Sequence, residues 1–195
     1  MHNARYGDGR KLARTRSRTM TDDSTNDASG GTARTAHDHP IEVFTDGACA
    51  GNPGPGGWAW AMTPGDVFGS GGAVHTTNQR MEVQAVLEAL RAIEGPLLIV
   101  SDSTYVVNCF RDRWWVRWKS NGWRNAKKEP VANTDLWMPL IELYEVRRPA
   151  FRWVKGHSGD AMNDLVDRLA VAASKGPFAD VATPPHPSAT PSLFD

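Results

Sequence analysis

Four carboxylates in this sequence stand where a folded chain could gather them into one reactive site. Asp46 ends a stretch that alternates as a strand does, and Asp102 follows the apolar run 97–100 and Ser101. Glu82 falls in the first turns of a predicted helix, and Asp167 falls in the last predicted helix. If the first and fourth strands are neighbours, Asp46 and Asp102 come level at one edge of the sheet, where open sheets bind their ligands.

Carboxylates that converge in this way need a compensating charge. Two carboxylates about 4 Å apart repel by roughly 4 kcal/mol at an effective dielectric near 20, whereas a whole fold is stable by only about 5–15 kcal/mol. The four acids therefore either share protons or bind cations. No set of cysteine or histidine ligands accompanies them, so ligation by oxygen favours Mg²⁺ or Mn²⁺. Two such ions about 3.5–4 Å apart can hold the attacking and leaving oxygens of a phosphodiester. For Glu82 alone, a helix cap or a surface salt bridge is the simpler interpretation.

Apolar spacing predicts the elements that must hold these acids in place. Residues 41–46 alternate as a half-buried strand does, and the stretch 48–57 is so rich in Gly and Pro that it predicts a loop. Further strands are predicted at 57–62, 67–74, 97–100 and 150–154, and short connections favour an antiparallel meander for the first three strands. Helices are predicted at 76–94, from 103 through 113 and beyond, at 133–146, and at 160–173 with Leu165, Leu169 and Ala172 facing inward. This order favours an α/β fold with a mixed sheet and helices packed on it.

The remaining sequence predicts one domain with a tail at each end. Residues 1–40 are polar, residues 176–195 are rich in proline, and both are predicted to be disordered, which leaves a domain at 41–175. Met20 is a second candidate for the first residue of the protein. There are two cysteines, no secretory signal and no apolar run long enough for a membrane helix. These features favour a cytoplasmic protein with no membrane contact. We also expect a monomer.

Five motifs in order resemble type 1 ribonuclease H, over about residues 41–175. They lie at 44–47 with 51–57, at 76–82, at 101–103, at 153–159 and at 163–167. The resemblance implies a ribonuclease H-like fold, with three antiparallel strands, then two parallel strands, and helices on both faces. It also implies Mg²⁺-dependent hydrolysis of the RNA strand of RNA–DNA hybrids by a two-metal-ion mechanism, which leaves 3′-hydroxyl and 5′-phosphate ends. Catalytic and metal-binding roles are carried over to Asp46, Glu82, Asp102 and Asp167.

His157 is a fifth candidate catalytic residue. It lies between Gly156 and Gly159, in a loop where its ring could move, and a neutral imidazole suits proton transfer or assistance to product departure. A structural role is the alternative interpretation. The stretch 160–162 departs from the resembled family and adds a negative charge beside His157, so the motion of the loop and the metal affinity can differ.

A basic and aromatic segment predicts contact with nucleic acid. Residues 105–130 contain seven Lys or Arg, two acids and four tryptophans. The resembled family grips the DNA strand here, which makes Trp118 and Trp123 candidates, although some of these tryptophans have the helical spacing of core residues. The resemblance also implies that the RNA 2′-hydroxyl is sensed by Cys49, Asn52, Asn78 and Gln79, and that DNA phosphate is contacted by Thr104 and Asn133.

Two other functions fit the fold class. A hybrid-binding module would bind without turnover, and a resolvase-like or integrase-like relative would cut DNA. The segment Pro191–Asp195 is similar to the short Ser-Leu-Phe peptides that hold the bacterial sliding clamp, which predicts a weak clamp contact through Leu193 and Phe194, with a chance match as the alternative.

Overall fold

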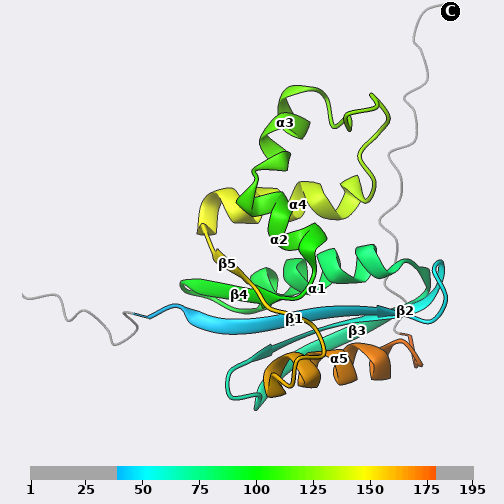
Figure 1. Ribbon diagram of the computed structural model, residues 1–195, viewed down its shortest axis with the longest axis vertical. Helices are drawn as coiled ribbons and strands as arrows, with labels where there is room; N and C mark the ends of the chain where they lie inside the picture. Colours follow the sequence, from blue (N-terminus) through cyan, green and yellow to red (C-terminus); the bar gives the residue numbers. More distant parts are fainter. Residues whose placement is uncertain (1–38, 179–195) are drawn as a thin grey trace, which may run out of the picture. The chain divides into compact units, whose positions relative to one another are not determined.

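Five strands form one mixed sheet in the computed structural model, which describes residues 39–178. The strands lie in the order β3-β2-β1-β4-β5 (Figure 1). The first three pair antiparallel, and β4 and β5 continue the sheet in parallel with β1. Their bounds are β1 Ile41–Cys49, β2 Gly54–Met62, β3 Val67–Thr76, β4 Leu97–Ser101 and β5 Ala150–Trp153. The mixed sheet and the meander are therefore confirmed.

Helices cover both faces of this sheet (Figure 1). The larger core lies between the sheet and helices α1, α2 and α4, and a smaller core lies under α5. The helices are α1 Asn78–Ala92, α2 Thr104–Arg111, α3 Trp114–Ser120, α4 Thr134–Arg147 and α5 Ala161–Ala173. Thr77 begins α1 by accepting a hydrogen bond from the Arg80 N–H, which fixes the turn that carries Glu82.

Strand β1 is buried on both faces, so the prediction of a half-buried strand is wrong. Val43 is 0% exposed in the larger core and Phe44 is 3% exposed in the smaller one. The predicted loop 48–57 is also too long, because β1 and β2 pair as far as Cys49 and Gly56. Glycine fits these paired positions because a Cβ on Gly57 would lie 2.3 Å from the carbonyl oxygen of Ala170. The glycines therefore let α5 pack directly on the strands.

The helix predicted from residue 103 through 113 and beyond is wrong, because two helices lie there. The chain leaves α2 at Asp112 and turns at Arg113, whose φ is +56°, before α3 begins. The left-handed residue changes the direction of the chain and sends α3 away from the sheet (Figure 1). In α5 the buried residues are Asn163, Val166 and Ala170. Leu165 and Leu169 are half-buried and pack against the smaller core, as predicted, whereas Ala172 is exposed, so its predicted inward position is wrong.

Several predictions fall on residues that the structure does not describe. The tail 1–40 lies almost wholly outside residues 39–178, as does most of 176–195, including Leu193 and Phe194. Both tails and the clamp contact stay predictions. Within residues 39–178, no helix has the length and apolar character that crossing a membrane requires.

Candidate active site

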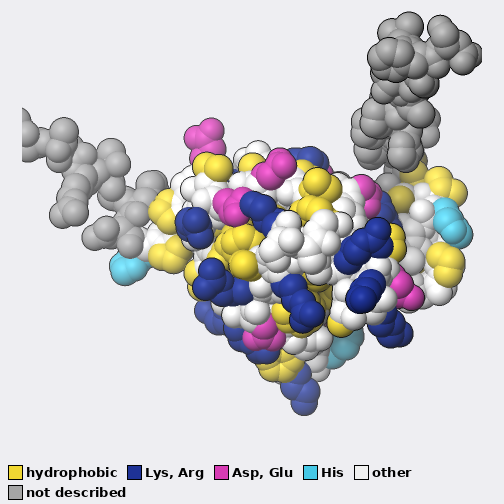
Figure 2. All heavy atoms as spheres, turned by 90° about the horizontal axis from the view of Figure 1, so that it is seen from above, with side chains coloured by type: hydrophobic (Ala, Val, Ile, Leu, Met, Phe, Trp, Pro, Cys, Tyr) yellow, Lys and Arg dark blue, Asp and Glu magenta, His cyan; other side chains and the backbone are white. Residues whose placement is uncertain are grey.

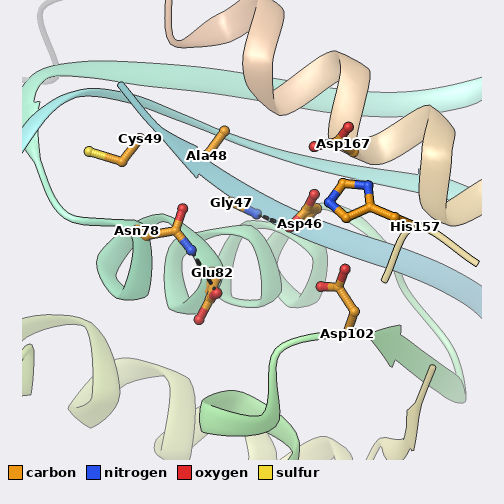
Figure 3. A pocket seen from close by; sticks show the side chains of 9 residues that line it. All are labelled: Asp46, Gly47, Ala48, Cys49, Asn78, Glu82, Asp102, His157 and Asp167. Atoms are coloured by element: carbon orange, nitrogen blue, oxygen red, sulfur yellow. Dashed lines mark hydrogen bonds between the residues drawn. The ribbon is translucent and has the colours of Figure 1, made fainter. Parts of the chain in front are cut away.

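All four predicted acids line one pocket with a volume of about 340 Å³. Asp46 comes from β1, Glu82 from α1, Asp102 from the residue after β4, and Asp167 from α5. Figure 3 shows Asp46, Asp102 and Asp167 pointing toward one another, whereas the Glu82 carboxylate lies to one side, turned toward Asn78. Gly47, Ala48, Cys49, Asn78 and His157 complete the lining. Four segments far apart in the sequence thus bring negative charge to one place.

The position of Asp46 makes its charged form unfavourable. Burial is the main cause that raises the pKa of Asp46 from 3.8 to about 7, and repulsion by Asp102 is the next. Asp167 and Glu82 raise this pKa further, whereas the Gly47 N–H, which donates to Asp46 Oδ1 at 2.7 Å, lowers it. The charged form of Asp46 is therefore repelled by all three of the other pocket acids.

Glu82 is held by two polar side chains. Asn78 Nδ2 donates to Glu82 Oε1 at 2.8 Å, and Ser103 Oγ donates to Glu82 Oε2 at 2.5 Å. Burial raises the pKa of Glu82, and both hydrogen bonds oppose that rise because they stabilise the carboxylate. Ser103 contacts a pocket acid but was not predicted as a site residue. Its position directly before a helix signalled a cap, but its contact with α1 could not be seen from spacing.

Asp102 is held by two further residues that were not predicted as site residues. Asn163 Nδ2 on α5 donates to Asp102 Oδ2 at 3.2 Å, and Trp153 Nε1 on β5 donates to the carbonyl oxygen of Asp102 at 2.9 Å. Gly156 also lies against this carboxylate, since a Cβ there would be 2.5 Å from Oδ2. Asn163, Trp153 and Gly156 all lie in the five motifs of the sequence analysis, so membership of those motifs could have identified them as candidate site residues.

His157 is exposed and lies at the rim formed by the loop between β5 and α5. Its φ of +51° is unusual for a residue other than glycine, and its ring lies beside Asp46 and Asp167 (Figure 3). Asp160, the added negative charge in this loop, begins α5. It accepts hydrogen bonds from the backbone N–H groups of Met162 and Asn163 at 3.0 and 3.1 Å.

Comparisons with known proteins agree with this geometry. The family model for RNase H matches residues 38–175. The chain belongs to the ribonuclease H family. It is 49% identical over 140 residues to the ribonuclease H of Syntrophomonas wolfei, which covers 69% of this chain and 96% of that one.

Two solved structures have a fold similar to that of this chain. LC9-RNase H1, a type 1 RNase H with the type 2 active-site motif, matches with a TM-score of 0.60 and 28% identity, over 69% of this chain and 72% of that one. A foamy viral protease-reverse transcriptase in complex with an RNA/DNA hybrid matches with a TM-score of 0.61 and 25% identity, over 69% of this chain and 20% of that one.

The donor set of this ribonuclease H fits divalent cations by its charge and chemistry. Within residues 39–178, none of the ion pairs involves any of the four pocket acids. Their carboxylate oxygens are the ligands that Mg²⁺ and Mn²⁺ prefer. In the same range, no three Asp, Glu, His or Cys side chains already form a ligand set for a metal. Glu82 is bound to Asn78 and Ser103 instead, so metal binding would require its carboxylate to be shared.

The predicted nucleic-acid contacts divide into two groups. Cys49 and Asn78 line the pocket, and Asn52 lies beside them, accepting from the Asn78 N–H at 3.4 Å. Gln79 and Thr104 are exposed but lie outside the lining. Asn133, also outside it, is half-buried and accepts from Arg80 at 3.5 Å.

Trp118 and Trp123 are half-buried in the region around α3. The Trp118 ring lies 5.5 Å from Trp137 and 6.2 Å from Trp123, between ring centroids, so both side chains pack partly on the larger core. Figure 2, seen from the side of α3, shows Lys and Arg side chains spread over this face with apolar side chains between them. The exposed positive charges here belong to Arg111, Arg113, Arg117, Lys119, Arg124, Lys127 and Lys128, and the exposed acids are Asp112 and Glu129.

Proposed function

We propose that this ribonuclease H cleaves the RNA strand of RNA–DNA hybrids with two divalent cations held by Asp46, Glu82, Asp102 and Asp167. One observation carries the proposal: four carboxylates line one pocket, and none of them has a cationic partner within the described residues. The match to a reverse transcriptase in complex with an RNA/DNA hybrid supports the choice of substrate.

The reaction is the attack of water on the scissile phosphorus of the RNA strand. The bond to the 3′-oxygen breaks, that oxygen takes up a proton, and the products carry 3′-hydroxyl and 5′-phosphate ends. Two bound Mg²⁺ or Mn²⁺ ions would supply charge stabilisation and an activated water. His157, at the rim, would carry the proton or assist departure of the product, for which a movable imidazole is suited.

Substrate choice would depend on the loop beside Asp46. Cys49, Asn52, Asn78 and Gln79 are the residues that we propose to sense the RNA 2′-hydroxyl. Asn78 supports this role because its amide also donates to Glu82 at 2.8 Å, so a contact with the sugar would be coupled to an active-site acid. Thr104, Asn133, Trp118 and Trp123 would contact the DNA strand, with the basic surface around α3 beneath its phosphates.

A cleavage assay tests this function. The purified chain is incubated with an RNA–DNA hybrid, duplex RNA and duplex DNA, each with and without Mg²⁺, and the products are separated on a gel. We expect cleavage of the hybrid only, with Mg²⁺ only, and loss of cleavage but not of hybrid binding in Asp102→Asn. Binding without turnover would indicate a hybrid-binding module, and cleavage of duplex DNA would indicate a DNA nuclease. Either result would overturn the proposal. The monomeric state, the cytoplasmic location and the clamp contact stay predictions.

A further inference from the structure

Asn163 joins α5 to the acid at the end of β4. Its side chain is only 2% exposed, and its Nδ2 donates to Asp102 Oδ2 at 3.2 Å. Asp167 follows four residues later, so the same face of α5 carries both the amide and a pocket acid. A displacement of this helix would therefore move two parts of the site together.

This contact leaves one oxygen of Asp102 free. Oδ2 is enclosed, because Asn163 donates to it and Gly156 lies so close that a Cβ there would be at 2.5 Å. Within residues 39–178, Oδ1 of Asp102 makes no hydrogen bond to another side chain or to the backbone. A neutral amide thus holds one oxygen in place without neutralising the carboxylate, and the other oxygen stays available to a cation.

A contribution to the stability of the fold does not explain why residue 163 carries an amide side chain. Its Oδ1 is buried and has no hydrogen-bond partner among the described residues. A buried polar atom without a partner is unfavourable, and an apolar side chain of similar size would avoid this cost. The Asn side chain is therefore better explained by its contact with Asp102 than by its packing.

Asp160 fixes the backbone of Asn163 itself. As the cap of α5 it accepts hydrogen bonds from the N–H groups of Met162 and Asn163, at 3.0 and 3.1 Å. The Asp160 carbonyl also accepts from the Asp164 N–H at 2.9 Å, which closes the first turn. Asp160 thereby fixes the backbone position of Asn163, whose side chain in turn binds Asp102.

We propose that Asp160 and Asn163 are a positioning pair that sets the orientation of the Asp102 carboxylate for cation binding, an inference that rests on the proposed function. Asn163 acts directly on the carboxylate, and Asp160 acts through the first turn of α5. Neither residue touches the reacting atoms. The pair should therefore affect metal affinity and turnover, and leave the affinity for the hybrid unchanged.

Five variants of the full chain test the pair. Asn163→Ala removes the amide, Asn163→Leu replaces it with an apolar side chain of similar size, and Asp160→Ala removes the cap. Asp160→Ser restores a capping oxygen without the charge. Glu142→Ala, at an exposed position on α4 outside the pocket, is the control. Three quantities are measured: Mn²⁺ binding without substrate by electron paramagnetic resonance, kcat and KM on the hybrid, and the midpoint of thermal unfolding.

We expect both Asn163 variants to bind Mn²⁺ about tenfold more weakly and to lose about tenfold in kcat, the equivalent of one hydrogen bond to a charged group. Their KM for the hybrid should be unchanged, and Asn163→Leu should unfold at or above the wild-type temperature. Asp160→Ala should show smaller losses of about threefold, and Asp160→Ser should restore wild-type values. Glu142→Ala should match the wild type throughout.

Three results would overturn this inference. Wild-type Mn²⁺ affinity and kcat in the folded Asn163 variants would remove the role of the amide. If Mn²⁺ affinity and kcat decrease only in variants whose unfolding temperature also decreases, Asn163 contributes to packing and does not position Asp102. Failure of Asp160→Ser to restore what Asp160→Ala loses would remove the role of the cap. If the wild type does not cleave the hybrid, the proposed function is wrong. If the wild type cleaves the hybrid and the variants have the same activity and Mn²⁺ affinity as the wild type, only the positioning role of Asp160 and Asn163 is wrong.

Discussion

Asp46 and Asp102 lie at the same level on neighbouring parallel strands, because Thr45 of β1 pairs with Ser101 of β4. Each carboxylate is the next residue along its strand direction, so the register alone brings the two charges together. Repulsion by Asp102 is second only to burial among the causes that raise the pKa of Asp46 to about 7. The centre of the pocket is therefore the place where a bound cation would relieve the most repulsion.

The free energy of unfolding should depend on pH through Asp46. Its pKa is 3.8 when unperturbed and about 7 in the fold, so between these pH values the folded state binds more protons than the unfolded state. Stability without divalent cations should therefore fall as pH rises from 4 to 7, and the loss should be complete above 7. Asp46→Asn removes this effect. At pH 8 we expect the variant to be more stable than the wild type by roughly 2–4 kcal/mol in urea unfolding with a chelator present.

Two comparisons control this prediction. At pH 4 the wild type and Asp46→Asn should differ little, because the wild-type carboxyl is then protonated in the fold. Mg²⁺ at pH 8 should stabilise the wild type more than the variant. An equal difference between the two proteins at both pH values would show that packing, and not charge, is responsible.

Ser103→Ala should weaken both α2 and the active site. The hydroxyl accepts from the Val106 N–H at 3.3 Å and donates to Glu82 Oε2 at 2.5 Å. Loss of the cap and of the hydrogen bond should lower the free energy of unfolding by about 1–2 kcal/mol. The same change raises the pKa of Glu82 further, so the loss of kcat should be greater at acidic pH. Ser103→Thr keeps a hydroxyl and is the matched control; equal losses in the two variants would contradict this account.

Gly156→Ala and Gly57→Ala should separate activity from stability. A methyl group on Gly156 would lie 2.5 Å from Asp102 Oδ2, a side-chain atom that can move away, whereas one on Gly57 would lie 2.3 Å from the backbone oxygen of Ala170. Neither glycine has positive φ, so only steric overlap matters. We expect Gly156→Ala to lose activity with little change in unfolding temperature. Gly57→Ala should lose about 1–3 kcal/mol of stability, as overpacked cores do. Kinetics and urea unfolding measure both, and the reverse pattern would refute the assignment.

The basic surface around α3 should bind nucleic acid through its phosphates. Lys127 and Lys128 are exposed in the segment between α3 and α4. In Lys127→Ala/Lys128→Ala, the plot of log affinity for the hybrid against log salt should become shallower by about 0.7–0.9 for each phosphate that the variant no longer binds. The kcat should not change. Arg91→Ala/Arg148→Ala, which removes two charges outside this segment, should keep the wild-type slope, and a similar decrease there would indicate a nonspecific effect of net charge.

The C-terminal segment gives a prediction that is independent of the active site. Leu193→Ala/Phe194→Ala should abolish weak binding to a bacterial sliding clamp, measured by surface plasmon resonance, and hybrid cleavage by the free enzyme should be unchanged. If the wild type and the variant bind the clamp equally, or if neither binds it, the similarity of this segment to clamp-binding peptides is a chance match.

Local chemistry allowed much of this fold to be predicted from the sequence. Thr77 begins α1, Gly95 follows its end, and the apolar run 97–100 forms the buried strand β4. These features depend on neighbouring residues, so spacing and capping rules were sufficient. The break between α2 and α3 was missed because Arg113 adopts a left-handed conformation that its residue type does not favour. The two-sided burial of β1 was missed because it depends on α5, which lies more than a hundred residues away.

The sequence by itself determined which acids stand at strand ends and helix faces, and its motifs placed them in the ribonuclease H family. Only the tertiary structure decided how these acids differ from one another. Asp46 is buried and repelled by its neighbours, Glu82 is held by Asn78 and Ser103, and Asp102 is held by Asn163. The physical reason is that residue type and spacing are local, whereas burial, repulsion and hydrogen bonding depend on groups brought together from distant parts of the chain.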